Sequence, residues 1–167
     1  MPPDIHFALP ALLPRLVAFA RTIVGNADTA RDLVQEAVAC ALGARRVPDT
    51  APAYRAWMFK IVRNAALDEL RRKRPEPLDA EPAVDRWRFD HACIAKITVE
   101  QGLANVAPPH REIIALIDIA GFSCAEAADV LNVPIGTVMS RITRARMALL
   151  AAIDASSVRP MKSSQVK

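Results

Sequence analysis

The sequence predicts an all-α protein of two small helical domains, and three observations support this prediction. Hydrophobic residues make up 52% of the chain but aromatic residues only 5%, which favours helices packed through alanine and aliphatic side chains. Apolar residues recur at spacings of three and four along most segments, which is the period of a helix. Three prolines and three acids interrupt this pattern over 75–83, so we expect a flexible acidic linker at 75–90 between domains at 1–74 and 91–155.

The N-terminal domain is expected to be a three-to-four-helix bundle. Its first helix is predicted over 9–24, where apolar residues fall on one face, and Gly25 should end it. The second helix should begin at Asp28 or Thr29, whose short side-chain oxygens can accept hydrogen bonds from the first free N–H groups. We expect Gly43 to end this second helix.

A long third helix is predicted over 53–74, after a polar loop at 45–52 that contains two prolines. This helix carries seven basic residues, two acids and the aromatic residues Tyr54, Trp57 and Phe59. Cations beside aromatic rings suit single-stranded DNA, because the bases can stack while the phosphates are neutralised. For any one of these aromatic residues, a place in the core is the better prediction.

The C-terminal domain is predicted to contain helices at about 92–106 and 109–120, followed by two short helices at 123–131 and 135–153. The last two helices and the short turn between them have the pattern of a helix-turn-helix. The polar segment 156–167 contains no acids and is expected to be disordered.

Local signals support the helix-turn-helix. Ser123 followed by Glu126 is the pattern of a capping box. Asn132 stands where the turn requires a left-handed residue, which asparagine tolerates better than most residues. Four apolar positions of the last helix should face inward: Val138, Ile142, Ala145 and Leu149. The opposite face presents hydroxyls and guanidiniums that suit major-groove edges and phosphates: Thr137, Ser140, Arg141 and Arg144.

The sequence also argues against other classes of protein. It has no signal-peptide pattern and no apolar run of the roughly 20 residues that span a bilayer, so we expect a cytoplasmic protein without membrane insertion. Cys40, Cys93 and Cys124 lie far apart, and His91 with Cys93 would supply at most two metal ligands. We therefore predict inert cysteines, no metal and no cofactor. No phosphate-binding loop or nucleophile motif is present, so an enzyme is not expected.

Three segments, taken together, resemble sigma factors of the extracytoplasmic-function (ECF) group within the sigma-70 family. Residues 32–36 (DLVQE) resemble the stretch that grips the clamp helices of the polymerase β′ subunit. Residues 54–58 (YRAWM) and 63–72 (RNAALDELRR) resemble the helix that reads and opens the −10 element. Residues 135–146 (IGTVMSRITRAR) resemble the −35 recognition helix.

The resemblance implies a role for specific residues. The polymerase contacts would be Asp32, Leu33, Gln35 and Glu36. Contacts to the −10 element, together with the loop at 45–52, would come from Arg55, Trp57, Lys60, Arg63, Asn64, Arg71 and Arg72. Contacts to the −35 element would come from Thr137, Ser140, Arg141, Arg144 and Arg146. The implied partners are the β′ clamp helices and β flap of core RNA polymerase, promoter DNA and an anti-sigma factor.

The sequence departs from the family pattern at a few positions. Met139 stands where a basic residue is common, which is expected to weaken or retune affinity for the −35 element. Cys124 replaces a common aromatic residue and Asn132 a usual glycine, and both are interpreted as packing or turn variants.

Two alternative binding functions remain open at this point. One is a helix-turn-helix regulator whose N-terminal half dimerises or senses a signal, although such a protein has no need of a basic, aromatic third helix. The other is a sigma-like decoy that binds an anti-sigma factor without touching DNA. The arginines at positions 141, 144 and 146 argue against a decoy.

Overall fold

The computed structural model describes residues 3–72 and 99–157, and every regular element within these ranges is a helix. The all-α prediction is therefore confirmed. The predicted linker at 75–90, the residues His91 and Cys93, and the end of the predicted tail from residue 158 lie outside the described residues.

The N-terminal unit consists of α1 (Pro3–Val24), α2 (Ala27–Leu42) and α3 (Ala51–Arg72), which pack against one another. Helix α1 begins six residues before the predicted start, and Pro10 and Pro14 lie inside it. Gly25 follows α1 with φ +76°, a left-handed conformation in which glycine is free of Cβ strain. The predicted ends of the first two helices at Gly25 and Gly43 are confirmed.

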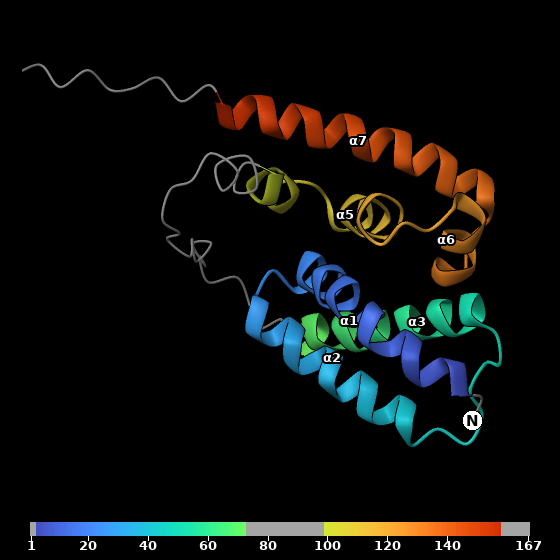
Figure 1. Cartoon of the computed structure of the whole chain (residues 1–167). Coiled ribbons are helices and arrows are strands. Elements are labelled where there is room, and N and C mark those ends of the chain that lie inside the picture. The colour runs from blue at the N-terminus through green and yellow to red at the C-terminus, as the bar shows by residue number, and fades with distance from the viewer. Residues whose placement is uncertain (1–2, 73–98, 158–167) are drawn as a thin grey trace, which may run out of the picture.

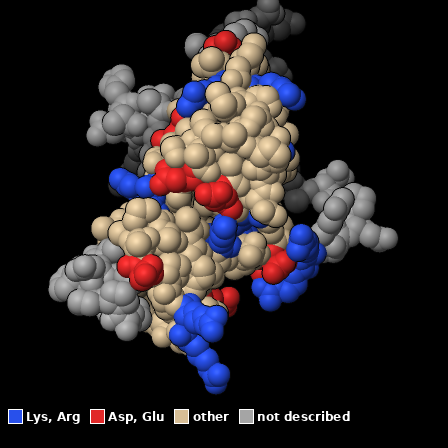
Figure 2. Space-filling view, turned by 90° about the vertical axis from the view of Figure 1, so that its right-hand side faces the viewer, with Lys and Arg blue, Asp and Glu red and all other residues tan. Residues whose placement is uncertain are grey.

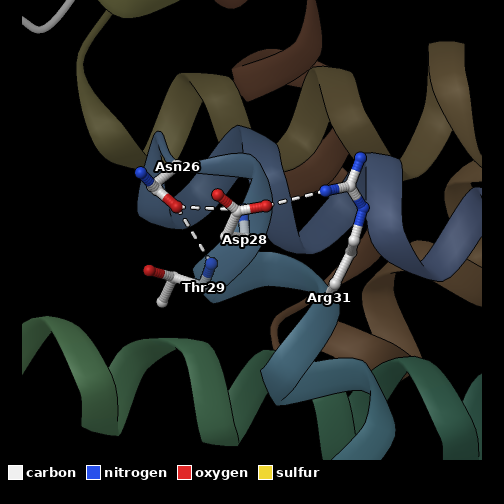
Figure 3. Close-up of polar contacts among 4 residues, drawn as sticks. All are labelled: Asn26, Asp28, Thr29 and Arg31. Carbon is white, nitrogen blue, oxygen red and sulfur yellow. Dashed lines mark hydrogen bonds and ion pairs between the residues drawn. The ribbon is translucent and has the colours of Figure 1, made fainter.

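The start of α2 corrects the predicted cap. Asn26 is the N-cap residue, and its Oδ1 accepts hydrogen bonds from the backbone N–H groups of Asp28 and Thr29, each at 2.9 Å (Figure 3). The Asp28 carboxylate instead forms an ion pair with Arg31, with an N–O distance of 2.7 Å. The side-chain oxygen of a capping residue accepts hydrogen bonds from N–H groups two or three residues further along the chain. Asp28 and Thr29 occupy these positions relative to Asn26, so they supply the N–H groups and not the cap, and the prediction was wrong.

The C-terminal unit contains α5 (Pro108–Ile114), a π-helical turn η1 (Ala115–Ile119), α6 (Cys124–Leu131) and α7 (Ile135–Ser157), and residues 99–104 before α5 are also helical. The predicted helix at 109–120 is thus an α-helix that continues as a π-turn, in which the Ala120 N–H donates to the Ala115 carbonyl five residues back. Apolar periodicity over so short a segment does not distinguish the two kinds of helix.

The two units are docked and share one hydrophobic core. Figure 1 shows α5 and α6 between the N-terminal bundle and α7, which lies on the outer side of the molecule. Helices α1 and α3 contact α5, η1 and α6, whereas α7 packs mainly on α5 and α6. The outward face of α7 consequently points away from the N-terminal unit.

Candidate nucleic-acid and polymerase interfaces

The helix-turn-helix is built by the local signals that the sequence predicted. The Ser123 hydroxyl accepts a hydrogen bond from the Glu126 N–H, and the Glu126 carboxylate accepts one from the Ser123 N–H at 2.8 Å, which completes a capping box. The hydrogen bond from the Ser123 N–H lowers the pKa of Glu126 most, and the Ser123 hydroxyl, which donates to the same carboxylate, lowers it further. Asn132 has φ 54° and ψ 50°, so the predicted left-handed turn residue is confirmed.

The inner face of α7 fixes the direction of its outer face. Val138 and Ala145 are fully buried, Ile142 is nearly so, and Leu149 packs against the core. At about 100° of rotation per residue, the four residues of the predicted outward set lie within an arc of about 100°. Ser140 and Arg144 are exposed, and Thr137 and Arg141 are half-buried. Within the described parts of the chain, neither Arg141 nor Arg144 forms an ion pair.

Arg146 lies on another flank of α7. Two residues of a helix separate it from Arg144 by about 200°, so the two guanidiniums point to different sides. Arg146 donates two hydrogen bonds to Asp118 of η1, at 2.5 and 3.2 Å, and these bonds raise its pKa. The structure does not bring Arg146 together with the other predicted −35 residues.

Helix α3 presents an open face and a docked face. Trp57, Lys60, Asn64 and Arg71 fall within an arc of about 60°, and all but the half-buried Trp57 are exposed. Trp57 and Lys60 also line a cleft of about 720 Å³, whose other wall is formed by α6 and the turn after it, including Asp129, Asn132 and Pro134. Phe59 is fully buried, which confirms the prediction that an aromatic residue of this helix belongs to the core.

The docked face of α3 carries Arg55 and Arg63, both assigned to the −10 element by the resemblance. Arg55 donates to the Ala120 carbonyl at 2.7 Å, and its guanidinium lies 3.9 Å from the centroid of the Phe122 ring. Arg63 pairs with Glu112 of α5, with N–O distances of 2.5 and 3.4 Å. Both side chains are therefore engaged by the C-terminal unit.

The last two predicted −10 residues are tethered within α3. Arg71 pairs with Asp68 at 2.9 Å, and Arg72 pairs with Glu69. The hydrogen bond that Arg72 donates to the Glu69 carboxylate, with a further contribution from the charge of Glu36 on α2, raises the pKa of Arg72. Both members of the Arg71 pair are largely exposed, so it contributes little stability, whereas the carboxylate that holds Arg72 is buried, with only 9% of the Glu69 side chain exposed.

Three of the predicted polymerase contacts form one exposed face of α2. Asp32, Gln35 and Glu36 are all exposed, and their spacing places them on the same side of the helix. Leu33 is only 5% exposed and belongs to the core shared with α1 and α3. Its side chain is therefore not available as a polymerase contact, which corrects the prediction for this residue.

Charge is distributed unevenly over the surface. Figure 2 shows acidic and basic side chains interspersed over the middle and lower parts of this view, below a broad uncharged area that is flanked by further charged side chains. Helix α7 also exposes large apolar side chains, which include Met139 and Met147. The basic side chains in this view form no continuous patch.

Sequence reasoning missed the residues that join the two units, namely Glu112, Ala120 and Phe122. The one signal in the sequence for this contact was an aromatic residue, Phe122, directly after Gly121. Among the described residues, no group of three His, Cys, Asp or Glu could hold a metal ion. No helix in the described ranges is long and apolar enough to cross a membrane.

The fold is thus that of a helix-turn-helix protein with a second helical unit docked on it. Two family models match the chain: sigma-70 region 2 over residues 10–76, and sigma-70 region 4 over residues 97–149. The first covers α3 with its basic face, and the second covers the helix-turn-helix.

Comparison with whole proteins agrees with these matches. The chain is 34% identical over 145 residues to the ECF RNA polymerase sigma factor EcfG of Rhodopseudomonas palustris (strain TIE-1), covering 84% of the chain and 80% of that relative. It is 30% identical over 143 residues to the ECF sigma factor SigW of Bacillus subtilis (strain 168), with 76% of each protein covered. The chain therefore belongs to the ECF group of the sigma-70 family of RNA polymerase sigma factors.

Solved structures show the same fold. The sigma factor RpoE from Bartonella quintana, in complex with the anti-sigma factor NepR, matches with a TM-score of 0.72 and 28% identity, covering 90% of this chain and 97% of that one. CnrH, in complex with the cytosolic domain of CnrY, matches with a TM-score of 0.66 and 29% identity, covering 90% and 88%.

Proposed function

We propose that this sigma factor directs core RNA polymerase to its promoters through three separate surfaces. They are the outward face of α7 (Thr137, Ser140, Arg141 and Arg144), the open face of α3 (Trp57, Lys60, Asn64 and Arg71), and the acidic face of α2 (Asp32, Gln35 and Glu36). The observation that supports this proposal best is that all three faces are accessible on one docked molecule.

The outward face of α7 is proposed to bind the −35 duplex. Its guanidiniums can contact guanine edges or phosphates, and its hydroxyls can donate to or accept from base edges. Arg144 is exposed, and the half-buried Arg141 lies beside it one turn earlier. Arg146, held by Asp118 on another flank, is proposed to contribute at most a phosphate contact at the margin of this surface.

The open face of α3 is proposed to receive the unpaired strand of the −10 element. Trp57 offers a ring for a base to stack on, and Lys60 and Asn64 lie beside it. Stacking of a base on an aromatic side chain contributes about 1–3 kcal/mol, which offsets part of the cost of separating the strands. Arg55 and Arg63 can join this surface only when the C-terminal unit releases them.

The α2 face is proposed to bind the β′ clamp helices, and the C-terminal unit the β flap. An anti-sigma factor is a proposed third partner, because the similar factors RpoE and CnrH were solved with NepR and with the cytosolic domain of CnrY. The role is binding and positioning without chemistry of its own, and it places the protein with the polymerase in the cytoplasm.

The test is transcription by core polymerase with and without the purified chain on fragmented genomic DNA. We expect discrete transcripts only when the chain is present. The double variant Lys60→Ala and Asn64→Ala should reduce promoter opening, measured by permanganate reactivity of unpaired thymines, while it still binds core polymerase. The double variant Gln35→Ala and Glu36→Ala should lower core binding itself.

The alternatives predict different results in the same experiment. A helix-turn-helix regulator would bind duplex DNA without yielding new transcripts, and a decoy would bind neither DNA nor core polymerase. If the chain fails to bind core polymerase at all, the proposed function is rejected.

A further inference from the structure

The exposed face of α7 extends beyond the arginines assigned to the −35 element. The direction opposite the buried residues of this helix passes close to Ser140. Arg144 and Arg141 lie on one side of this direction, at about 50° and 110° around the axis. Thr143 and Met139 lie on the other side, at about 50° and 90°. The face of α7 therefore has a cationic half and a second half that the proposed contacts leave unused.

The second half of this face offers apolar groups to a ligand. Met139 is 56% exposed, and its thioether has no hydrogen to donate. Thr143 is exposed, and its hydroxyl donates to the Met139 carbonyl at 3.1 Å, so this proton is already engaged within the helix. What Thr143 adds to the surface is chiefly its methyl group. Met139 and Thr143 together are called the apolar half of the α7 face below.

A helix in the major groove has base edges on both of its flanks, because the groove is only about 12 Å wide. Guanine, adenine and cytosine present donors and acceptors there, whereas thymine also presents a 5-methyl group. An apolar side chain packed on a polar edge would leave that edge without its hydrogen bonds. Packed on a methyl group, it removes apolar surface from water on both sides. The apolar half thus favours thymine over the other bases.

Gly136 allows the groove to come close to this part of α7. It is exposed, one turn before Met139 and Ser140. A Cβ added to Gly136 would meet no described atom within 4 Å, and its φ is not positive, so the fold itself does not require glycine here. Glycine lowers the stability of a helix relative to alanine, and close approach of a ligand is a common reason to retain it. The missing side chain brings Met139 within reach of base edges.

We propose that Met139 and Thr143 are specificity-determining residues that recognise thymine 5-methyl groups in the −35 element. The inference rests on the −35 role proposed for α7 and names the base feature that one half of the helix reads. Arg141 and Arg144 bind guanine edges or phosphates on the other half. At the base pair that faces Met139, this factor prefers thymine where an arginine would select guanine.

The test compares thymine with uracil, which lacks only the 5-methyl group. Holoenzyme reconstituted from the full-length chain first selects DNA from a promoter library randomised over the −35 segment, and sequencing shows where thymine is enriched. The selected duplex is then synthesised with deoxyuridine at each of these positions in turn. We expect filter binding to show about fourfold weaker binding for each methyl group that α7 contacts, the factor that burial of one such group contributes.

Two variants remove the proposed contacts one at a time. Thr143→Ser keeps the hydroxyl and loses only the methyl group, and Met139→Ala removes the exposed apolar side chain. Each variant should no longer distinguish thymine from uracil at its own position, and should still do so at the other. Leu150→Ala is the matched control, because Leu150 is 63% exposed and lies about 20° around the axis from Met139 but about 16 Å further along it. It should distinguish the two bases as the parent does.

Met139→Arg tests the same contact in the opposite direction. An arginine can donate to O6 and N7 of guanine, so the base selected at that position should change from thymine to guanine. The added positive charge tightens binding to every sequence, so the result is judged by the selected base and not by affinity.

Three results would overturn the proposal, given variants that are folded by circular dichroism. They are a library without enriched thymine, equal binding of the thymine and uracil duplexes by the parent, and the parent's full discrimination in both Met139→Ala and Thr143→Ser. Weaker binding of Met139→Ala to core polymerase, with its base preference unchanged, would also overturn it and assign the apolar half to a protein partner.

Failure of methyl recognition is distinguishable from failure of the −35 role itself. In the first case Arg144→Ala still weakens binding of the holoenzyme to promoter duplex, although the thymine and uracil duplexes bind alike. In the second case Arg144→Ala leaves promoter binding unchanged.

Discussion

Helices α3 and α7 both carry arginines that the sequence assigns to DNA, yet their surroundings differ. Helix α7 lies on the side of the molecule away from the N-terminal unit (Figure 1), and its Arg141 and Arg144 form no ion pair with any described residue. On α3, Arg55 and Arg63 are engaged by the C-terminal unit, and only part of the helix remains open. Whether an arginine is available to DNA therefore depends on the residues that face it from another part of the fold, which the sequence of its own helix does not reveal.

The inner faces of the two helices differ as well. Helix α7 is held through small and aliphatic residues such as Val138 and Ala145. Helix α3 is held through Phe59, which lies 5.2 Å from Phe19 on one side and 4.8 Å from Phe122 on the other, between ring centroids. Phe59 therefore links the packing of α1 to that of the C-terminal unit, so the two units should unfold together.

The largest expected effect is the loss of Phe59, which links the packing of the two units. Phe59→Ala should lower the free energy of unfolding by about 3–5 kcal/mol, because it removes a fully buried ring and leaves a cavity between the two units. Urea denaturation followed by circular dichroism measures this loss. The parent protein should unfold in a single transition, and the variant should show the N-terminal and C-terminal units separating into two.

Trp57→Ala is the control within the same helix. Trp57 is half-buried on the open face, so its loss should cost clearly less stability than the loss of Phe59, while it weakens binding to single-stranded DNA. If the two substitutions cost the same stability, the division of α3 into a core face and an open face is wrong.

The next effect tests α7 in the same way. Arg141→Ala and Arg144→Ala should each weaken binding of the holoenzyme to promoter duplex by about 1–3 kcal/mol, if each guanidinium contacts a base edge. A residue that contacts only phosphate should instead lower the salt dependence of binding by about one unit of slope. Filter binding at several salt concentrations separates the two cases.

Arg146→Ala provides the contrast on the other flank. It removes the same charge from the same helix, but its guanidinium is held by Asp118 about 200° around the axis from Arg144. We expect a clearly smaller loss of affinity. A loss as large as that of Arg144→Ala would show that the α7 surface extends around the helix to this flank.

The sequence predicts best where the cause is local. The capping box of Ser123 and Glu126, the left-handed Asn132 and the inward positions of α7 all depend on neighbours a few residues away, and the structure confirms them. The cap of α2 was missed by two residues although Asn26 is also local, because several adjacent polar side chains could have served.

The predictions fail where the cause lies in another part of the fold. The resemblance assigns Leu33 to the polymerase, yet this residue, like Val34 beside it, is buried where α2 packs on α1 and α3. Arg63 and Glu112 are 49 residues apart, and no periodicity within α3 indicates that they meet. Likewise Arg146 follows Arg144 closely in the sequence, but only the position of η1 explains why it pairs with Asp118.

The smallest effect concerns the local cap that orients the helix-turn-helix. Ser123→Ala should lower the free energy of unfolding by about 1 kcal/mol, because the Glu126 N–H loses its acceptor. The pKa of Glu126 is lowered from 4.5 by its hydrogen bonds from Ser123, so the folded protein favours the ionised carboxylate. This contribution is complete above pH 4.5 and is lost as the pH falls through the lowered pKa.

Urea denaturation of the parent and the Ser123→Ala variant, at neutral pH and again below pH 4.5, tests this sign. The difference between the two proteins should shrink in acid, since the Ser123 hydroxyl also donates to the carboxylate at 2.8 Å. Ser140→Ala is the matched control, because the Ser140 hydroxyl bonds only within the turn of its own helix, to the Thr137 carbonyl. If the difference in unfolding free energy between the two proteins stays constant across this pH range, the cap acts only through the Ser123 hydroxyl that accepts from the Glu126 N–H. If Ser140→Ala costs as much stability as Ser123→Ala, the capping box makes no special contribution to the stability of α6.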